Sequence, residues 1–180
     1  MKFNLKKKIK YWTQAARLET LPLSISGIIL GSSYAFYNQS FDYIIFTLCL
    51  FTAISFQILS NFANDYGDGV LGTDNNRIGP SRVLASGKLS IKELKKGILI
   101  NVLISITFSF SLIKYSFKND YFLILFFLFL STLSIVAAIK YTMGKNPYGY
   151  YGLGDIFVFI FFGLLSVFGS FFFAKKSYKL

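Results

Sequence analysis

The stretch YFLILFFLFLSTLSIVAAI, residues 121–139, contains no charged side chain, and it decides the class of fold. A helix needs about 20 predominantly apolar residues to cross the hydrocarbon layer of a membrane, with a range of about 17 to 25. Of the 180 residues in the chain, 54% are hydrophobic and only 15% are charged. A soluble domain of this length has too little interior to bury so much apolar surface. The chain is therefore predicted to be an integral membrane protein surrounded by the lipid bilayer.

Four further apolar stretches accompany this one, at Leu21–Tyr37, Tyr43–Ala63, Ile98–Ile113 and Leu153–Ala174. The first and third of these are short for a membrane span unless flanking residues extend their helices. Together the five stretches predict an all-α fold, a multi-span transmembrane helical bundle of about five spans. We interpret residues 1–180 as a single integral-membrane region without internal repeats.

The basic residues are distributed as membrane topology requires. With a cytoplasmic N-terminus and five alternating spans, the cytoplasmic segments 1–20, 64–97 and 140–152 hold 6, 6 and 2 of the 19 Lys and Arg residues. The opposite segments 38–42, 114–120 and 175–180 hold 0, 2 and 3. Because basic loops remain in the cytoplasm, this bias predicts a multi-pass protein with its N-terminus inside. The net charge of +11 is then explained by topology, and no nucleic acid is expected as a partner.

Acidic and amide side chains gather at the start of the one long polar loop, residues 64–97. Their positions define an acid-rich corner that comprises Asn61, Asn64, Asp65, Asp68 and Asp74. Asn61, Asp65 and Asp68 are spaced i, i+4 and i+7, so a helix continuing from the second span would place them on one face. Mg2+ prefers such hard oxygen ligands and usually takes one or two carboxylates together with substrate phosphates. The alternative is a solvated turn, because Asp, Asn and Gly are also turn residues.

Basic residues follow in the same loop. Arg77 and Arg82 could hold a diphosphate beside a magnesium–carboxylate site, or they could simply be cytoplasmic positive charges. Ser90 and Glu93 predict a capping box from which a helix enters the third span. The chain contains no His and only Cys49, which excludes His-ligated metals, an internal disulfide and a Cys-only zinc site.

A second polar cluster lies between the fourth and fifth spans, at residues 141–155. Tyr141 and Lys145 are spaced i and i+4 and could offer a hydroxyl and an ammonium group to one anion. Asp155 begins the last span, where a carboxylate suits the helix N-terminus and capping is its default role. The topology places this cluster on the same membrane face as the acid-rich corner. Two polar patches that converge on one end of an apolar bundle form a candidate binding site.

From Trp12 to about Phe172 the sequence resembles the UbiA superfamily of intramembrane aromatic prenyltransferases. The resemblance rests on ARLETLPLS (16–24), QILSNFANDYGDGVLGTD (57–74), RIGPSRVLASG (77–87), YTMGKNPYGYYGLGDIFVFIFFG (141–163) and LSVFGS (165–170). The Asp-rich, RIGPSR and YGYYGLGD stretches are similar to the branch that acts on 1,4-dihydroxy-2-naphthoate in menaquinone synthesis. The N-terminal run departs from the family pattern, since Leu18 stands where a Pro is expected.

The resemblance implies a reaction and a set of residues for it. A polyprenyl diphosphate and dihydroxynaphthoate would be the substrates, in a bacterial inner (plasma) membrane, and Mg2+ the cofactor. The first family motif is matched by Asn61, Asp65 and Asp68, which would hold the metal. Oxygens of the departing diphosphate would be held by basic and hydroxyl groups, namely Arg77, Arg82, Tyr141 and Lys145.

The family fold has about nine helices and a second Asp-rich motif in its C-terminal half, so this chain resembles the N-terminal half. A separately encoded C-terminal half is one expected partner. Three alternatives stay open: an enzyme that prenylates 4-hydroxybenzoate, an inactive remnant without catalysis, and a small channel or transporter subunit. The last would require a polar stripe within the spans, where few charges are found.

Overall fold

The computed structural model describes residues 5–74 and 78–179, with side chains described as far as Ser177. Every regular element among these residues is a helix. The α-helices are α1 (Leu5–Ala16), α2 (Leu21–Tyr37), α3 (Tyr43–Leu71), α4 (Ile91–Phe117), α5 (Tyr121–Lys140), α6 (Gly154–Val158) and α7 (Ser166–Lys179). Two short 3-10 turns, η1 (Leu18–Thr20) and η2 (Tyr148–Tyr151), precede α2 and α6, and the π-helical segment η3 (Phe159–Leu165) joins α6 to α7.

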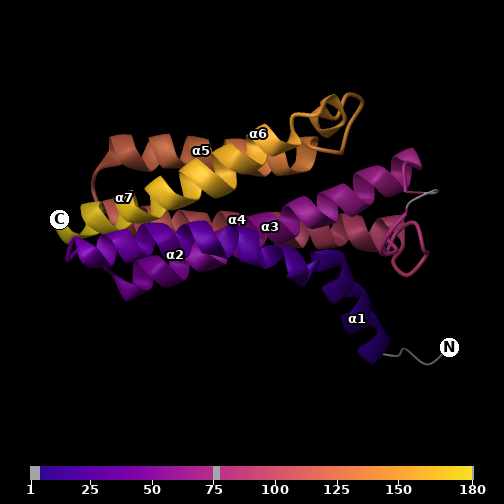
Figure 1. The fold of residues 1–180 in the computed structure, drawn as a ribbon, viewed down its shortest axis with the longest axis horizontal. Helices are drawn as coiled ribbons and strands as arrows, with labels where there is room; N and C mark the ends of the chain where they lie inside the picture. The colour runs from indigo at the N-terminus through magenta and orange to yellow at the C-terminus, as the bar shows by residue number, and fades with distance from the viewer. Residues whose placement is uncertain (1–4, 75–77, 180) are drawn as a thin grey trace.

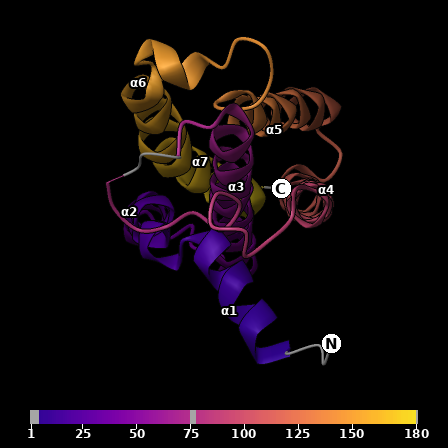
Figure 2. The same ribbon diagram turned by 90° about the vertical axis from the view of Figure 1, so that its right-hand side faces the viewer.

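The long helices lie side by side in one bundle, as Figure 1 shows. Viewed along the bundle, α3 lies among α2, α4, α5 and α7 (Figure 2). One end of the bundle, called the polar end here, holds α1, the α3–α4 connection and the α5–α6 connection (Figure 1). The three segments predicted to lie in the cytoplasm are therefore on one side of the bundle, as the basic-residue count requires.

Four of the described helical segments are long and apolar enough to cross a membrane: α3, α4, α5 and the continuous helix Gly154–Ser177. The short third stretch of the sequence is extended by its flanks into the 27-residue α4. The first stretch forms α2, whose 17 residues stand at the lower limit of about 17 for a span. The predicted all-α multi-span bundle is confirmed.

Local sequence signals start three of these helices. Asp42 precedes α3 and accepts hydrogen bonds from the backbone N–H groups of Ile44 at 2.7 Å and Ile45 at 3.0 Å. Asp120 does the same for α5 through the N–H of Leu123. Ser90 and Glu93 form the predicted capping box at the start of α4. Each cap provides a partner for N–H groups that the first helical turn leaves unbonded.

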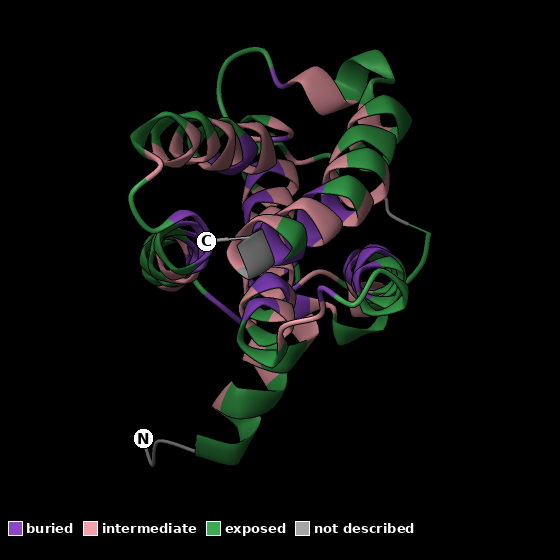
Figure 3. Ribbon diagram, turned by 90° about the vertical axis from the view of Figure 1, so that its left-hand side faces the viewer, coloured by how far each residue is buried: buried purple, intermediate pink, exposed green. Residues whose placement is uncertain are grey.

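The outer surface of the bundle is apolar, and small residues make the close contact between α2 and α7. Exposed bands run along the outward faces of the helices in Figure 3, and on α5 the side chains of Phe122 and Leu125 are 77% and 68% exposed. Between α2 and α7, a Cβ on Gly27 would overlap Ser166, and one on Gly31 would overlap Ser170. Apolar exteriors with small residues at helix crossings are typical of bundles solvated by lipid.

Candidate functional site

Helix α3 continues as one helix through the acid-rich corner to Leu71. Gly72, with φ 77°, then ends it in the left-handed conformation that glycine adopts without strain. The prediction that one continuous helix carries Asn61, Asp65 and Asp68 is therefore confirmed. The neighbouring elements decide what each of these side chains contacts.

Asn61 joins α3 to the N-terminal segment. Its side chain is 4% exposed, and its Nδ2 donates to the carbonyl oxygen of Ala16 at 2.8 Å and to Thr20 Oγ1 at 2.9 Å. One turn earlier, Gln57 Nε2 donates to the same Thr20 Oγ1 at 3.1 Å. This side of α3 therefore holds the α1–α2 connection in place.

Asp65 joins α3 to the loop that precedes α4. It is 1% exposed, its Oδ2 accepts from the backbone N–H of Val83 at 3.1 Å, and its Oδ1 accepts from that of Leu84 at 3.2 Å. Hydrogen bonds from backbone N–H groups compensate a buried carboxylate for its lost hydration. Both oxygens of Asp65 thus contact the protein's own backbone.

Asp68 faces the α5–α6 connection, residues 141–153, which we call the aromatic loop. Its Oδ1 accepts a hydrogen bond of 2.6 Å from the hydroxyl of Tyr150. Burial, and then the bond to Asp68, raise the pKa of Tyr150 above its ordinary value, so the hydroxyl keeps its proton as a donor. Thr73 Oγ1 lies 3.4 Å from the same Tyr150 oxygen. This contact gives Tyr150 a place in the site that the sequence analysis had not assigned.

Two further contacts hold the aromatic loop against α3. Thr142 is buried, and its Oγ1 donates to the carbonyl oxygen of Ala63 at 3.0 Å. Gly67 packs directly on Thr142, because a Cβ at position 67 would overlap the Thr142 backbone. The two polar clusters predicted to converge are therefore in contact at the polar end of the bundle.

Asn64 contributes an oxygen atom that no described group satisfies. It is half-buried, and its Oδ1 is shielded from solvent without a hydrogen-bond partner among the described residues. Asn64 lies one helical turn before Asp68 and so shares a side of α3 with it. A buried amide oxygen without a partner is costly unless a ligand completes it. Together with the carboxylate of Asp68, it is a donor set that suits Mg2+.

The last acid of the corner, Asp74, lies near a basic side chain of the α3–α4 connection. Asp74 is 8% exposed, and its Oδ1 lies 3.9 Å from Nε of Arg82, whose side chain is 14% exposed. Arg77 lies outside the described residues. Within residues 5–74 and 78–179, no three Asp, Glu, His or Cys side chains lie close enough together to hold a metal ion. The described acidic side chains alone therefore do not form a complete metal site.

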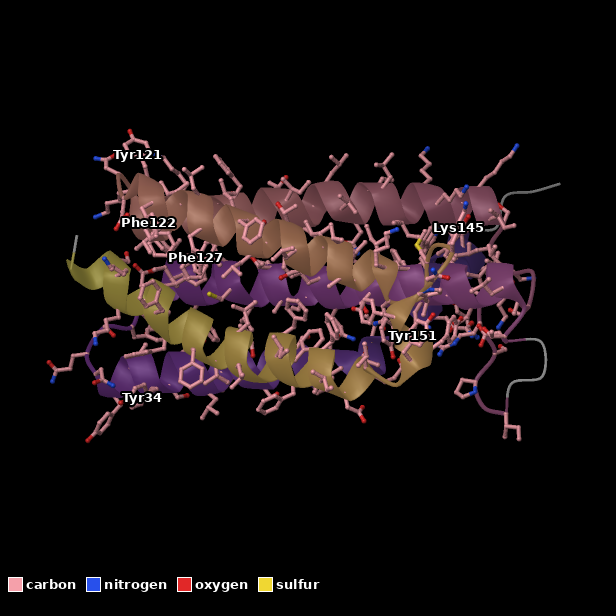
Figure 4. The ribbon with its side chains drawn as sticks, turned by 90° about the horizontal axis from the view of Figure 1, so that it is seen from above. Tyr34, Tyr121, Phe122, Phe127, Lys145 and Tyr151 are labelled. Carbon is pink, nitrogen blue, oxygen red and sulfur yellow. The ribbon has the colours of Figure 1, made fainter. Side chains whose placement is uncertain are left out.

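The predicted helical spacing of Tyr141 and Lys145 is not found, because α5 ends at Lys140 and Gly144 takes φ 112°. Tyr141 is half-buried, and a Cβ on Gly154 would lie 2.7 Å from its hydroxyl. Lys145 is exposed at the same end of the bundle as Tyr151 (Figure 4). Asp155 is exposed in the first turn of α6, where a negative charge suits the helix N-terminus, but no side-chain hydrogen bond among the described residues caps this helix.

An apolar cavity of about 240 Å³ opens inside the bundle next to this cluster. It is lined by residues of α2, α3, α4, α5 and the helix from Gly154 onward. Tyr141 and Tyr148 of the aromatic loop line it, and so does Phe127, which lies toward the opposite end of the bundle (Figure 4). The ring of Phe173, another lining residue, has its centroid 4.7 Å from that of Phe127. The lining residues include Ser60, one turn before Asn64 on α3, but neither Asn64 nor Asp68. The cavity therefore begins beside the acid-rich corner.

Comparison with protein families matches residues 24–178 to the UbiA prenyltransferase family. The chain belongs to this family. The match covers the bundle from α2 through α7 and includes both polar clusters. The family resemblance drawn from the quoted motifs is thus confirmed.

Curated relatives in the UbiA family are similar over most of this chain. A 1,4-dihydroxy-2-naphthoate octaprenyltransferase of Haemophilus influenzae is 45% identical over 178 residues, which cover 96% of this chain and 57% of that protein. The protein of the same name from Escherichia coli is 44% identical over 88% of this chain and 52% of its own length. One from Mycobacterium leprae is 31% identical. The chain thus spans about half the length of the curated relatives it matches, and no solved structure matches it.

Proposed function

We propose that this chain takes part in transferring a polyprenyl group from polyprenyl diphosphate to 1,4-dihydroxy-2-naphthoate. In that reaction the allylic carbon–oxygen bond to diphosphate breaks and a carbon–carbon bond to the naphthoate ring forms. The ring loses its carboxylate as CO2, and diphosphate leaves. The immediate product, demethylmenaquinol, is the reduced form of demethylmenaquinone, and it would be made in a bacterial inner membrane with the polar end of the bundle in the cytoplasm. The names and identities of the Haemophilus influenzae and Escherichia coli relatives support this choice of substrates.

The observation that carries the proposal is that Asn64 and Asp68 follow directly on α3 after Ser60, which lines an apolar cavity in the bundle. The diphosphate is highly charged and the prenyl tail is a hydrocarbon, so the substrate needs a polar end and an apolar channel in contact. Asp68 meets the aromatic loop through Tyr150, and Tyr141 of that loop lines the cavity. A charged head at the corner would therefore have a dry path for its tail directly beside it.

On this proposal Asn64 and Asp68 would hold Mg2+. Asn61 and Asp65, which the sequence motif assigned to the metal, would instead fix the α1–α2 connection and the loop that carries Arg82. When bound, Mg2+ supplies positive charge that makes diphosphate a better leaving group. Lys145, in the aromatic loop, is exposed at the polar end, where its ammonium group could approach a diphosphate oxygen. Arg77 and Arg82, in the connection between α3 and α4, would add two positive charges for the same diphosphate. Phe-rich cavity walls would exclude water from the carbocation-like carbon. The donors missing from the metal site would come from a second half, encoded separately or following this chain.

The test uses membranes from a bacterium that lacks its own dihydroxynaphthoate prenyltransferase and expresses this chain. Labelled octaprenyl diphosphate is supplied with dihydroxynaphthoate or 4-hydroxybenzoate, with Mg2+ or with EDTA, and with or without the C-terminal half of the Escherichia coli relative. When the second half is present, we expect Mg2+-dependent formation of the prenylated naphthoquinol, which is recovered as the quinone after oxidation in air. A product only from 4-hydroxybenzoate would reject the proposed acceptor. No product from either acceptor, with both halves present in the membrane, would favour the inactive remnant.

A further inference from the structure

Helix α1 consists of two halves with different surroundings. In its C-terminal half, Ala15 and Ala16 are buried, and the ring of Trp12 packs edge-on against Phe62 with centroids 5.4 Å apart. Gly97 of α4 allows this close approach, since a Cβ there would overlap the Trp12 ring. The C-terminal half is therefore anchored in the bundle, and the direction in which α1 leaves it is fixed.

The N-terminal half points away from the bundle. Figures 1 and 2, which view the molecule from perpendicular directions, both show α1 extending sideways beyond the other helices at the polar end. A helix that extends sideways from the end of a membrane-spanning bundle overlies the surface of the surrounding lipid. This direction distinguishes α1 from the other long helices, which run along the bundle.

This half of α1 is amphipathic. Leu5 and Ile9, one turn apart, are 62% and 55% exposed. Lys6 and Lys10, also one turn apart, are exposed on the adjoining face. Nothing in the described part of the chain covers Leu5 and Ile9. A basic face beside an exposed apolar face is the pattern of helices that lie in the interface of a membrane.

The charge around this half is strongly positive. The first turns of α4 add Lys92, Lys95 and Lys96, all exposed. Glu93, the acidic residue in the same turns of α4, forms an ion pair with Lys8 of α1, so its charge is already neutralised. This ion pair also connects α1 to α4. We call Lys6, Lys10, Lys92, Lys95 and Lys96 the basic collar. Topology requires positive charges on this side of the membrane, but not their position beside exposed Leu and Ile side chains.

We propose that the N-terminal half of α1 binds the anionic phospholipid surface of the leaflet at the polar end. Leu5 and Ile9 enter the boundary between headgroups and acyl chains, while Lys6 and Lys10 contact lipid phosphates with the rest of the collar beside them. Charge complementarity identifies the partner, since the cytoplasmic leaflet is negatively charged. This binding is independent of prenyl transfer.

The experiment places a fluorescent probe on the surface in question. The whole chain, with Ile9→Cys for labelling and Cys49→Ser to remove the buried native thiol, carries an environment-sensitive nitrobenzoxadiazole group at position 9. It is reconstituted in vesicles of phosphatidylcholine, with or without phosphatidylglycerol. We expect blue-shifted emission and quenching by spin-labelled lipid in the anionic vesicles, and several-fold less quenching in the neutral vesicles or at high salt.

Two double variants separate headgroup binding from general effects of charge. K6Q with K10Q should abolish the difference between the two vesicle types. The matched control, K114Q with K118Q at the opposite end of the bundle, removes the same charge and should leave the difference intact. Equal quenching in both vesicle types, or an unchanged difference in the first variant, would overturn the proposal. A probe shielded from water but not quenched by lipid would also overturn it, because protein would then cover this face.

Discussion

Two pairs of side chains near the end of α3 have similar composition and different surroundings. Asn61 and Asp65 are almost fully buried, and their contacts are with Ala16, Thr20 and the backbone after Arg82. Asn64 and Asp68 are half-buried. Asn64 keeps an oxygen without a partner in the described chain, and Asp68 is bonded to a side-chain hydroxyl. The first pair holds the N-terminal segment and the loop, and the second pair remains available to a ligand.

The largest effect that separates the pairs is expected for metal binding at Asp68. Asp68→Asn removes the negative charge but keeps the shape, so we expect Mn2+, used as a probe for Mg2+, to bind at least about 10-fold more weakly. In an active two-half enzyme, transfer should fall by about 100-fold or more. Binding is measured from the electron paramagnetic resonance signal of free Mn2+ on the purified chain. Unchanged Mn2+ affinity would remove Asp68 from the metal site.

The opposite pattern is expected at Asp65. Asp65→Ala leaves two backbone N–H groups buried without acceptors, at a cost of about 1–3 kcal/mol each, so the free energy of unfolding should fall by about 2–6 kcal/mol. Asp65→Asn keeps one acceptor and should cost less. Unfolding is followed in mixed detergent micelles by circular dichroism.

The Asp65 variants that still fold should bind Mn2+ about as tightly as the parent chain does. If Asp65→Asn proved stable but lost Mn2+ binding, Asp65 would join Asp68 as a metal ligand, and the division between the two pairs would fail. The variant pair Asp65→Asn and Asp68→Asn thus compares the same chemical change at the two positions.

Features that depend on neighbouring residues in the sequence were predicted, and individual contacts between distant residues were not. The apolar stretches, the capping box at Ser90 and the continuation of α3 are local patterns, and all were predicted. The contact of Asp68 with Tyr150 joins residues 82 apart, and it depends on how the aromatic loop folds back over α3. Helical spacing places Asp65 and Asp68 on one broad face, but packing decides which neighbour each one meets. Likewise, Tyr141 and Lys145 do not share a helix face, because α5 ends before them and the chain turns at Gly144.

Tyr150 tests whether its hydrogen bond holds the aromatic loop or the metal. Tyr150→Phe removes the hydroxyl and should lower the free energy of unfolding by about 1–2 kcal/mol, as expected for a hydrogen bond to a charged acceptor at a partly exposed site. The same change frees an oxygen of Asp68, so Mn2+ affinity should not decrease. Both quantities are measured on one preparation. A large loss of Mn2+ affinity with unchanged stability would instead make Tyr150 a positioning residue for the metal site.

The smallest effect is expected at Thr73, the third group near the Asp68–Tyr150 contact. Its hydroxyl is exposed and donates to the carbonyl oxygen of Asp68 at 3.2 Å, but that oxygen also accepts the backbone N–H groups of Gly72 and Thr73. Thr73→Ala therefore leaves no buried group unsatisfied, and the change in unfolding free energy should stay below about 0.5 kcal/mol. Mn2+ affinity should also be unchanged. A clear loss of either quantity would show that the Thr73 hydroxyl, 3.4 Å from that of Tyr150, orients the tyrosine toward Asp68.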